Sequence, residues 1–284
     1  MVAHGLPAVA DDLVVDDYEL LDVGGGARLE RFGARIVARP QPAVTVGRRN
    51  PALWSQSTLT FEPGRGWTGK IDPWTVDVAG VQIELRPTPT GQVGLFPEQA
   101  PSWEWLRARI APGMDVLNLF AYTGAATLVA AAAGASVVHV DGSRPTVTWA
   151  RRNAELSGLA DRPIRWIVDD VPAFVAREVR RARRYDGVVL DPPSYGHGAD
   201  GRAWRMEDGL APLLDGCAEL TGGPDGFVLI TAHTPGFGPE RLAGELARAI
   251  GVPPAAVERG ALRLSAANGA TLELGAFARW PGAR

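Results

Sequence analysis

The feature that most constrains this chain is an alternation of apolar runs and helical segments that begins after Pro97. Strands separated by helices at this spacing form a parallel sheet that carries helices on both faces. We therefore predict an α/β domain with a Rossmann-like sheet. Its first five strands are predicted at Val116–Phe120, Val137–Val140, Ile164–Val168, Val188–Leu190 and Phe227–Ile230.

The segments between these runs end in glycine or proline, as helices do. Near the C-terminus, Asn268-Gly269 separates two β-prone runs, and this pair is a strong signal for a tight hairpin turn. Adding the hairpin completes a seven-stranded sheet with an antiparallel C-terminal pair. The helices are predicted at Ser102–Arg109, Ala125–Ala133, Thr146–Leu156, Ala173–Arg183 and Leu210–Leu220, and the hairpin strands at Leu262–Ser265 and Thr271–Phe277.

The first part of the chain has a different pattern. Short β-prone pieces alternate with turn residues, at Tyr18–Val23, Ala27–Phe32 and Ile36–Ala38. Val76–Val78 and Val81–Leu85 are expected to form a hairpin, and the second of these runs alternates apolar and polar side chains as a half-buried strand does. We predict a small β-rich domain at residues 1–98, followed by the α/β domain at residues 99–284. Aromatic side chains dominate small cores, so its core is expected to contain Trp54, Trp67 and Trp74.

Composition narrows the function classes. Hydrophobic residues make up 46% and charged residues 21% of the chain, which is typical of a globular protein. The net charge of −3 neither indicates nor excludes nucleic-acid binding. The single cysteine, Cys217, excludes an intramolecular disulfide and a cysteine-cluster metal site, and no metal is expected. Neither a signal peptide nor a membrane-spanning apolar stretch is visible, so the cytoplasm is the expected compartment. Both a monomer and a homodimer fit the sequence.

Two of the predicted strands are followed by residues suited to bind a nucleoside. Asn118-Leu119-Phe120-Ala121-Tyr122-Thr123-Gly124 leads a strand into a turn with a glycine before the next helix, where backbone N–H groups favour an anionic group. Asp141 ends the second strand, where an acidic residue can accept both ribose hydroxyls. The alternative is that Asp141 or Ser143 caps the following helix.

The third strand is followed by Asp169-Asp170. A carboxylate at this position can accept the exocyclic amino group of an adenine, but it can also cap the next helix. The residues alone leave both roles open, and Asp169 is the preferred adenine ligand.

The fourth strand leads into Asp191-Pro192-Pro193-Ser194-Tyr195. Two consecutive prolines fix φ and withhold N–H donors, so the turn is stiff and presents carbonyl oxygens together with the Asp191 carboxylate. Such a turn can accept hydrogen bonds from an amino group and position a planar ring, on which Tyr195 could stack. The alternative, a rigid loop without chemistry, is disfavoured by its place directly after an apolar strand.

Together these stretches resemble the class I methyltransferases, and more closely a bacterial branch related to the large-subunit ribosomal RNA methyltransferases. The resemblance is carried by Phe96-Pro97-Glu98-Gln99, the Asn118–Gly124 turn, Val140–Ser143, Trp149–Leu159 and the Asp-Pro-Pro turn. It implies S-adenosylmethionine as the cofactor. The residues that it places at the cofactor are Gln99, Asn118, Phe120, Tyr122, Gly124, Asp141, Ser143, Asp169 and Asp191.

The chain departs from that branch at one chemically important position. Relatives that methylate cytosine C5 use a cysteine after the fifth strand, whereas this chain reads Ala232-His233, and C5 needs a thiolate adduct to react. Cys217, in an apolar helix, is expected to be buried and inert. We therefore expect a nitrogen or oxygen acceptor, for which catalysis is mainly alignment and proton removal. The candidate catalytic residues are Asp191, Pro192, Tyr195 and His233, with His197 as a further candidate base.

The substrate class is less constrained. RNA is the leading hypothesis by family analogy, and a small molecule of specialised metabolism is the alternative, since the N-terminal RNA-binding module of many relatives has no room here. A non-catalytic binding module is disfavoured by the intact Asp-Pro-Pro turn. Basic or aromatic residues that could contact RNA are Arg177, Arg180, Arg181, Arg183 and Arg184 on one segment, and Arg202, Trp204 and Arg205 near the Asp-Pro-Pro turn. For the arginines of the first segment, a solvated helix face is the slightly favoured alternative.

Overall fold

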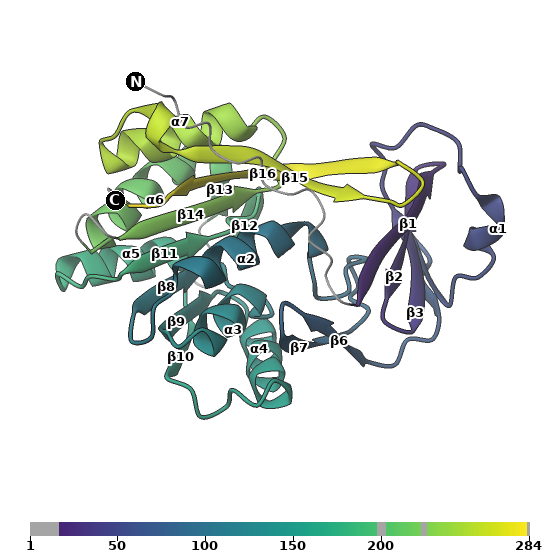
Figure 1. Cartoon of the computed structure of the whole chain (residues 1–284), viewed down its shortest axis with the longest axis horizontal. Coiled ribbons are helices and arrows are strands. Elements are labelled where there is room, and N and C mark those ends of the chain that lie inside the picture. The colour runs from purple at the N-terminus through teal and green to yellow at the C-terminus, as the bar shows by residue number, and fades with distance from the viewer. Residues whose placement is uncertain (1–16, 198–202, 223–225, 283–284) are drawn as a thin grey trace, which may run out of the picture.

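The computed structural model describes residues 17–197, 203–222 and 226–282, and Figure 1 shows a large α/β part and a smaller β-rich part. The large part is built on a seven-stranded sheet. Its strands, in spatial order, are β10 (Ile164–Val168), β9 (Ser136–Asp141), β8 (Asp115–Leu119), β11 (Gly187–Leu190), β14 (Phe227–Ala232), β16 (Thr271–Trp280) and β15 (Glu258–Ser265).

The first five strands of this sheet are parallel, and β16 runs antiparallel to both β14 and β15. This arrangement confirms the predicted fold class. The crossover from β10 back to β11 reverses the strand order beside β8, and ligands of open α/β sheets bind at such a reversal.

Helices cover both faces because neighbouring residues of each central strand point to opposite sides. The helices are α2 (Ala100–Arg109), α3 (Ala125–Ala132), α4 (Arg144–Leu156), α5 (Val171–Arg180), α6 (Met206–Leu220) and α7 (Pro239–Ile250), and a short 3-10 turn, η2 (Pro254–Ala256), precedes β15. Leu117 and Leu119 of β8 pack in one core with α5, α6 and α7, whereas Val116 packs in another core with α2 and α3.

Some boundaries differ from the prediction for local reasons. Helix α5 begins at Val171 because the Asp170 side chain accepts the N–H of Ala173 at 3.0 Å and caps the helix. It ends at Arg180, before the predicted Arg183, and Ala182 takes a left-handed φ of 51°. Helix α7 was not predicted at all.

The small part is a five-stranded sheet, of which the first three strands were predicted and the last two were not. Trp54 is buried on this sheet, as expected, while Trp67 and Trp74 are only partly buried. The elements are β1 (Tyr18–Gly24), β2 (Ala27–Phe32), β3 (Arg35–Pro40), α1 (Pro51–Trp54), β4 (Leu59–Glu62) and β5 (Gly66–Gly69).

The hairpin β6 (Trp74–Val78) and β7 (Val81–Leu85) packs against the α/β part, although it precedes the predicted boundary. Its backbone is hydrogen-bonded to side chains at the C-terminal end of helix α4. The N–H of Gln82 donates to Ser157 Oγ at 2.9 Å, and the N–H of Glu84 donates to Asn153 Oδ1 at 2.9 Å. The 3-10 turn η1 (Pro97–Gln99) then leads into α2. The division at residue 98 stays a prediction.

The β15–β16 hairpin extends from the large sheet to the small one (Figure 1). At its tip, Asn268 donates from Nδ2 to Asp22 at 3.1 Å, and Ala266 forms a β-bridge with Leu20 of β1. The predicted Asn-Gly turn therefore joins the two parts of the molecule. Within the described ranges, no helix is long and apolar enough to cross a membrane.

Candidate active site

A cavity of about 500 Å³ lies at the carboxyl ends of the parallel strands. We call it the main cavity, and a small cavity of about 70 Å³ adjoins it beside Phe96, Phe120, Tyr122 and Asp191. The main cavity is lined by residues that follow four strands, namely Phe120, Tyr122, Asp141 to Ser143, Asp169 to Pro172 and Asp191 to Pro193, together with Phe96, Gly196, Trp204 and His233. Gln99, Asn118 and Gly124 line the small cavity.

The turn after β8 is held in an unusual backbone conformation. Phe120 and Tyr122 have left-handed φ angles of 52° and 50°, and Gly124, the N-cap of α3, has φ 92°. Left-handed backbone at non-glycine residues costs roughly 1 kcal/mol or more and persists only where neighbours impose it. Here the Thr123 hydroxyl donates to the Gly94 carbonyl at 2.7 Å, which ties the turn to the segment before η1.

Asp141 is connected to both neighbouring loops. Its Oδ2 accepts the N–H of Tyr122 at 2.9 Å, and its Oδ1 accepts the N–H of Ser143 at 2.8 Å. Burial raises the pKa of Asp141, and the two N–H groups only partly offset this. Ser143 caps α4 by accepting the N–H of Thr146, so Asp141 is not the cap and its remaining lone pairs are available at the main cavity.

The two consecutive aspartates after β10 have separate positions. Asp170 caps α5, whereas Asp169 lines the main cavity and forms an ion pair with Arg177. The capping role that both could fill is therefore taken by Asp170. Arg177, one of the arginines considered for RNA, is used in this pair.

Asp191 anchors a polar network between three elements. Its Oδ1 accepts the Thr231 hydroxyl at 2.7 Å and its Oδ2 accepts the Gln99 amide at 3.2 Å. The same Gln99 nitrogen lies 3.3 Å from His233 Nε2, and His233 follows the last residue of β14 directly. Gln99, Asp191 and His233, all predicted site residues, are thus brought together.

The Asp-Pro-Pro turn is fixed by a two-stranded ribbon, β12 (Tyr195–His197) and β13 (Ala203–Arg205). The indole N–H of Trp204 donates to the Pro193 carbonyl at 2.7 Å, and its ring lies 5.4 Å from that of Phe120. Pro192 and Trp204 line the main cavity. Tyr195 is 55% exposed and does not line either of the two cavities described.

Two residues considered in the sequence, Asn118 and Cys217, are buried in the fold. Asn118 is buried and donates from Nδ2 to Thr127 at 2.8 Å, which ties β8 to α3. Cys217 lies in the core between the sheet and its helices, and burial raises the pKa of its thiol to about 12. A thiol with that pKa is protonated at neutral pH, as expected for an inert cysteine.

Two side chains at the site were not predicted. Glu98 is buried with Oε1 at 3.7 Å from His233 Nδ1, and Thr231 donates to Asp191. The sequence gives only a weak signal for Glu98. It precedes the predicted ligand Gln99 directly, but its partner His233 is more than a hundred residues away. The side chain of His197 and all of Arg202 lie outside the described residues.

The remaining arginines considered for RNA do not reach the main cavity. Arg183 and Arg184 border a groove at the opposite end of the sheet, with Arg162 and Arg165. Arg181 pairs with Glu178 at 3.0 Å. Arg205, on the ribbon beside Trp204, is exposed.

Comparison with known proteins identifies the family. A family model described as S-adenosylmethionine-dependent methyltransferase matches residues 59–259. The crystal structure of an S-adenosylmethionine-dependent methyltransferase from Agrobacterium tumefaciens is similar over 99% of this chain and 95% of that one, with a TM-score of 0.89 and 33% identity.

Curated relatives match over shorter stretches. Ribosomal RNA large subunit methyltransferase K/L of Syntrophotalea carbinolica is 41% identical over 147 residues, which are 48% of this chain and 20% of that protein. Ribosomal RNA large subunit methyltransferase I of Alteromonas mediterranea is 29% identical over 198 residues, 68% of this chain and 49% of that protein. The match thus spans only a fifth to a half of these relatives. The family model and the Agrobacterium structure cover most of the chain, which therefore belongs to the S-adenosylmethionine-dependent methyltransferase family, with S-adenosylmethionine as its cofactor.

Proposed function

We propose that this protein transfers the methyl group of S-adenosylmethionine to a nitrogen or oxygen acceptor in RNA, with ribosomal RNA as the substrate class and the cytoplasm as the compartment. The names of the curated relatives support RNA, because both are ribosomal RNA methyltransferases. They are matched over only part of their length, so the substrate is inferred for this chain and not transferred from them.

The cofactor is proposed to lie along the main cavity, across the ends of β8, β9 and β10. The Asp141 carboxylate would accept the ribose hydroxyls with the lone pairs that Tyr122 and Ser143 leave available. Asp169 would accept the adenine amino group beside Val171. The start of α3, reached through Gly124, would bind the cofactor's carboxylate with its backbone N–H groups. Gln99, Asn118 and Phe120 would complete this site.

The single observation that carries the proposal is the chemistry of the other end of the main cavity. Asp191, Pro192 and Trp204 all line it, and the Trp204 indole donates to the Pro193 carbonyl at 2.7 Å. An aromatic ring with an N–H group would pack against these flat side chains and donate to Asp191, as a nucleobase does. Among the residues that the structure describes, no Lys or Arg lines this cavity, so phosphates would be bound outside it, with Arg205 as a candidate contact.

The residues after β14 support a reaction without a covalent enzyme adduct. Cytosine C5 becomes nucleophilic only after a thiolate adds to the ring, and this position holds His233. Cys217 is protonated and lies in the core. A nitrogen or oxygen acceptor already has a lone pair, so Asp191, Pro192, Tyr195 and His233 are proposed only to align it and remove its proton.

The test is methyl transfer with labelled S-adenosylmethionine to ribosomal subunits and, separately, to a pool of cell metabolites. We expect label in RNA, and expect Asp191→Asn to abolish it while S-adenosylmethionine binding persists. Glu207→Gln, an exposed change on α6, is the matched control and should retain activity. Label confined to metabolites would reject RNA as the substrate, and 5-methylcytosine in the product would overturn the argument from the missing cysteine.

A further inference from the structure

The protonation of His233 can be assigned from its neighbours. Nδ1 lies 2.9 Å from the carbonyl oxygen of Leu274, which only accepts, so Nδ1 carries a proton. Nε2 lies 3.3 Å from the side-chain nitrogen of Gln99. That nitrogen must be the amide NH₂, because it also lies 3.2 Å from Asp191 Oδ2. His233 Nε2 is therefore the unprotonated nitrogen of the neutral ring, with a lone pair that faces the Gln99 NH₂, and His233 lines the main cavity.

A second carboxylate lies behind this ring. Glu98 is only 3% exposed, and its Oε1 lies 3.7 Å from His233 Nδ1. Its other oxygen, Oε2, has no hydrogen-bond partner in the described part of the chain. Burial raises the pKa of Glu98, while His233 and Arg28 lower it in part. Buried polar atoms without partners are rare in proteins and call for an explanation, which can be functional.

The charges around His233 make its imidazole a stronger base. Burial alone would lower the pKa of His233, but Asp191 at 3.8 Å, Glu98 and the Leu274 carbonyl outweigh burial, and the pKa is raised. The opposing cation is Arg28 of β2. The ring is also fixed in place, because it packs against Phe96 at a centroid distance of 5.6 Å.

We propose that His233 Nε2 accepts the proton released by the methyl acceptor, and that Glu98 is a positioning residue whose charge stabilises the imidazolium, while the Leu274 carbonyl holds the ring through Nδ1. This role rests on the proposed function. As the acceptor's lone pair bonds to the methyl carbon, the carbon–sulfur bond breaks and the sulfonium becomes a neutral thioether. The acceptor atom is left with a positive charge and a proton, and that proton moves to Nε2. The arrangement uses the same logic as a carboxylate that supports a catalytic imidazole in hydrolases.

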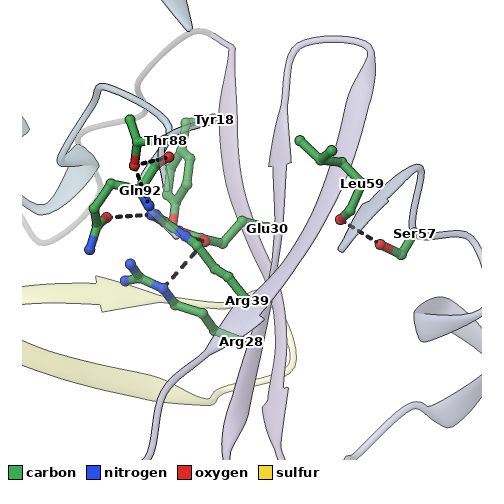
Figure 2. Close-up of polar contacts among 8 residues, drawn as sticks. All are labelled: Tyr18, Arg28, Glu30, Arg39, Ser57, Leu59, Thr88 and Gln92. Atoms are coloured by element: carbon green, nitrogen blue, oxygen red, sulfur yellow. Dashed lines mark hydrogen bonds and ion pairs between the residues drawn. The ribbon is translucent and has the colours of Figure 1, made fainter. Parts of the chain in front are cut away.

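The small sheet takes part in this charge balance. Figure 2 shows Arg28 and Arg39 converging on Glu30, which is fully buried and also accepts the Tyr18 hydroxyl at 3.0 Å. Glu30 neutralises one of the two arginines, so one positive charge remains. Arg28 and Arg39 both act to lower the pKa of Glu98, against the burial that raises it. The N-terminal part is thereby an electrostatic component of the active site.

The electrostatic effect of Glu98 on His233 can be measured without knowing the methyl acceptor. The chain has only four histidines, so their imidazole resonances can be followed by NMR in selectively labelled protein and assigned with His233→Asn. We expect His233 to titrate above its ordinary pKa of about 6.5, and Glu98→Gln to lower that pKa by about one unit or more. Glu155→Gln, an exposed change on α4, is the control and should leave the titration unchanged. An unchanged His233 pKa in Glu98→Gln would overturn the role of Glu98.

Activity supplies the second measurement. In the labelled-methyl assay, with whichever acceptor pool takes the label, kcat should fall at least tenfold in His233→Asn. In Glu98→Gln the pH profile of kcat should shift toward lower pH, with unchanged affinity for S-adenosylmethionine. Glu98→Asp, which keeps the charge, should restore part of the shift and guards against a folding defect in Glu98→Gln. A His233→Asn variant with wild-type rate and pH profile would reject the proton-transfer step. Label that never enters RNA would refute the RNA substrate alone, because the NMR titration is independent of the substrate.

Discussion

Asp141 and Tyr122 are joined by a hydrogen bond of 2.9 Å between a carboxylate oxygen at the end of β9 and a backbone N–H in the turn after β8. The bond holds Tyr122 in its left-handed conformation, with φ 50°. One carboxylate thus fixes the neighbouring turn and, in our proposal, also binds the ribose. The same residue serves the local fold and the cofactor, so a single substitution should disturb both.

Asp141→Asn replaces one oxygen by an NH₂ group that faces an N–H donor. We expect the dissociation constant for S-adenosylmethionine, measured by calorimetry, to rise at least tenfold, because a hydrogen bond to a charged group contributes about 1.5–3 kcal/mol. The melting temperature should fall only modestly. Asp161→Asn, an exposed change in the loop before β10, should leave the affinity unchanged. Unaltered binding in Asp141→Asn would remove Asp141 from the cofactor site.

Asp169 and Arg177 allow the adenine contact to be separated from the ion pair. We expect Asp169→Asn to weaken S-adenosylmethionine binding about tenfold, since the exocyclic amino group loses a charged acceptor. Arg177→Gln should have a smaller effect, because a partly exposed ion pair contributes about 1 kcal/mol at most. Titration calorimetry of the two variants decides the matter. Equal losses would mean that Asp169 acts only through its pairing with Arg177.

His139 makes stability depend on pH. Burial in β9, together with the nearby Arg151, lowers the pKa of its imidazole to about 3, so the unfolded chain takes up the proton first. Stability from this group is complete above the unfolded pKa of about 6.5 and is lost as the pH falls toward 3. The slope is at most about 1.4 kcal/mol per pH unit.

The measurement is urea denaturation at several pH values in this range. Between about pH 6.5 and 5, the free energy of unfolding of the wild type should fall by about 2 kcal/mol more than that of His139→Gln. This difference does not depend on the stability of the variant at neutral pH. Parallel pH dependences in the two proteins would contradict the assignment of a neutral, buried imidazole. His139 Nδ1 lies 2.9 Å from the Thr127 hydroxyl, so Thr127→Val is a control that removes this contact and keeps the titrating ring.

Asp22 should be the main polar link between the small sheet and the hairpin tip. It is fully buried and accepts hydrogen bonds from the backbone N–H groups of Val23 and Asn50, the Trp54 indole and the Asn268 amide. Asp22→Ala leaves these donors without a partner and should cost about 3–5 kcal/mol of unfolding free energy. Asn268→Ala removes one bond and should cost about 1 kcal/mol. Thermal denaturation of both variants compares them.

The same residue has a predictable pH dependence. Burial would raise the pKa of Asp22, but its hydrogen bonds outweigh burial and hold the pKa below the ordinary value. Its contribution is therefore complete above the unfolded pKa and is lost as the pH falls through the lowered folded value. Asp22→Asn should flatten the acid limb of the stability profile, and an unchanged limb would contradict this account.

Much of the fold could be predicted because its signals are local. The apolar runs of the five parallel strands and the Asn268-Gly269 turn each report on a few neighbouring residues. The strands β4 and β5 were missed because each has only four residues, and Gly66 and Gly69 interrupt the pattern. Helix α7 was missed although its apolar residues face the core, because it follows a stretch rich in glycine and proline.

The sequence by itself determined the order of strands and helices, and it placed the candidate ligands at the carboxyl ends of the strands, since chain direction and side-chain period are local properties. Only the tertiary structure decided that Asp170 and not Asp169 caps α5, and that the hairpin β6–β7 packs against α4. It also brought Glu98, Asp191 and His233 together from three separate elements. Such contacts join residues far apart in the chain and depend on how whole elements pack, so no local pattern can encode them.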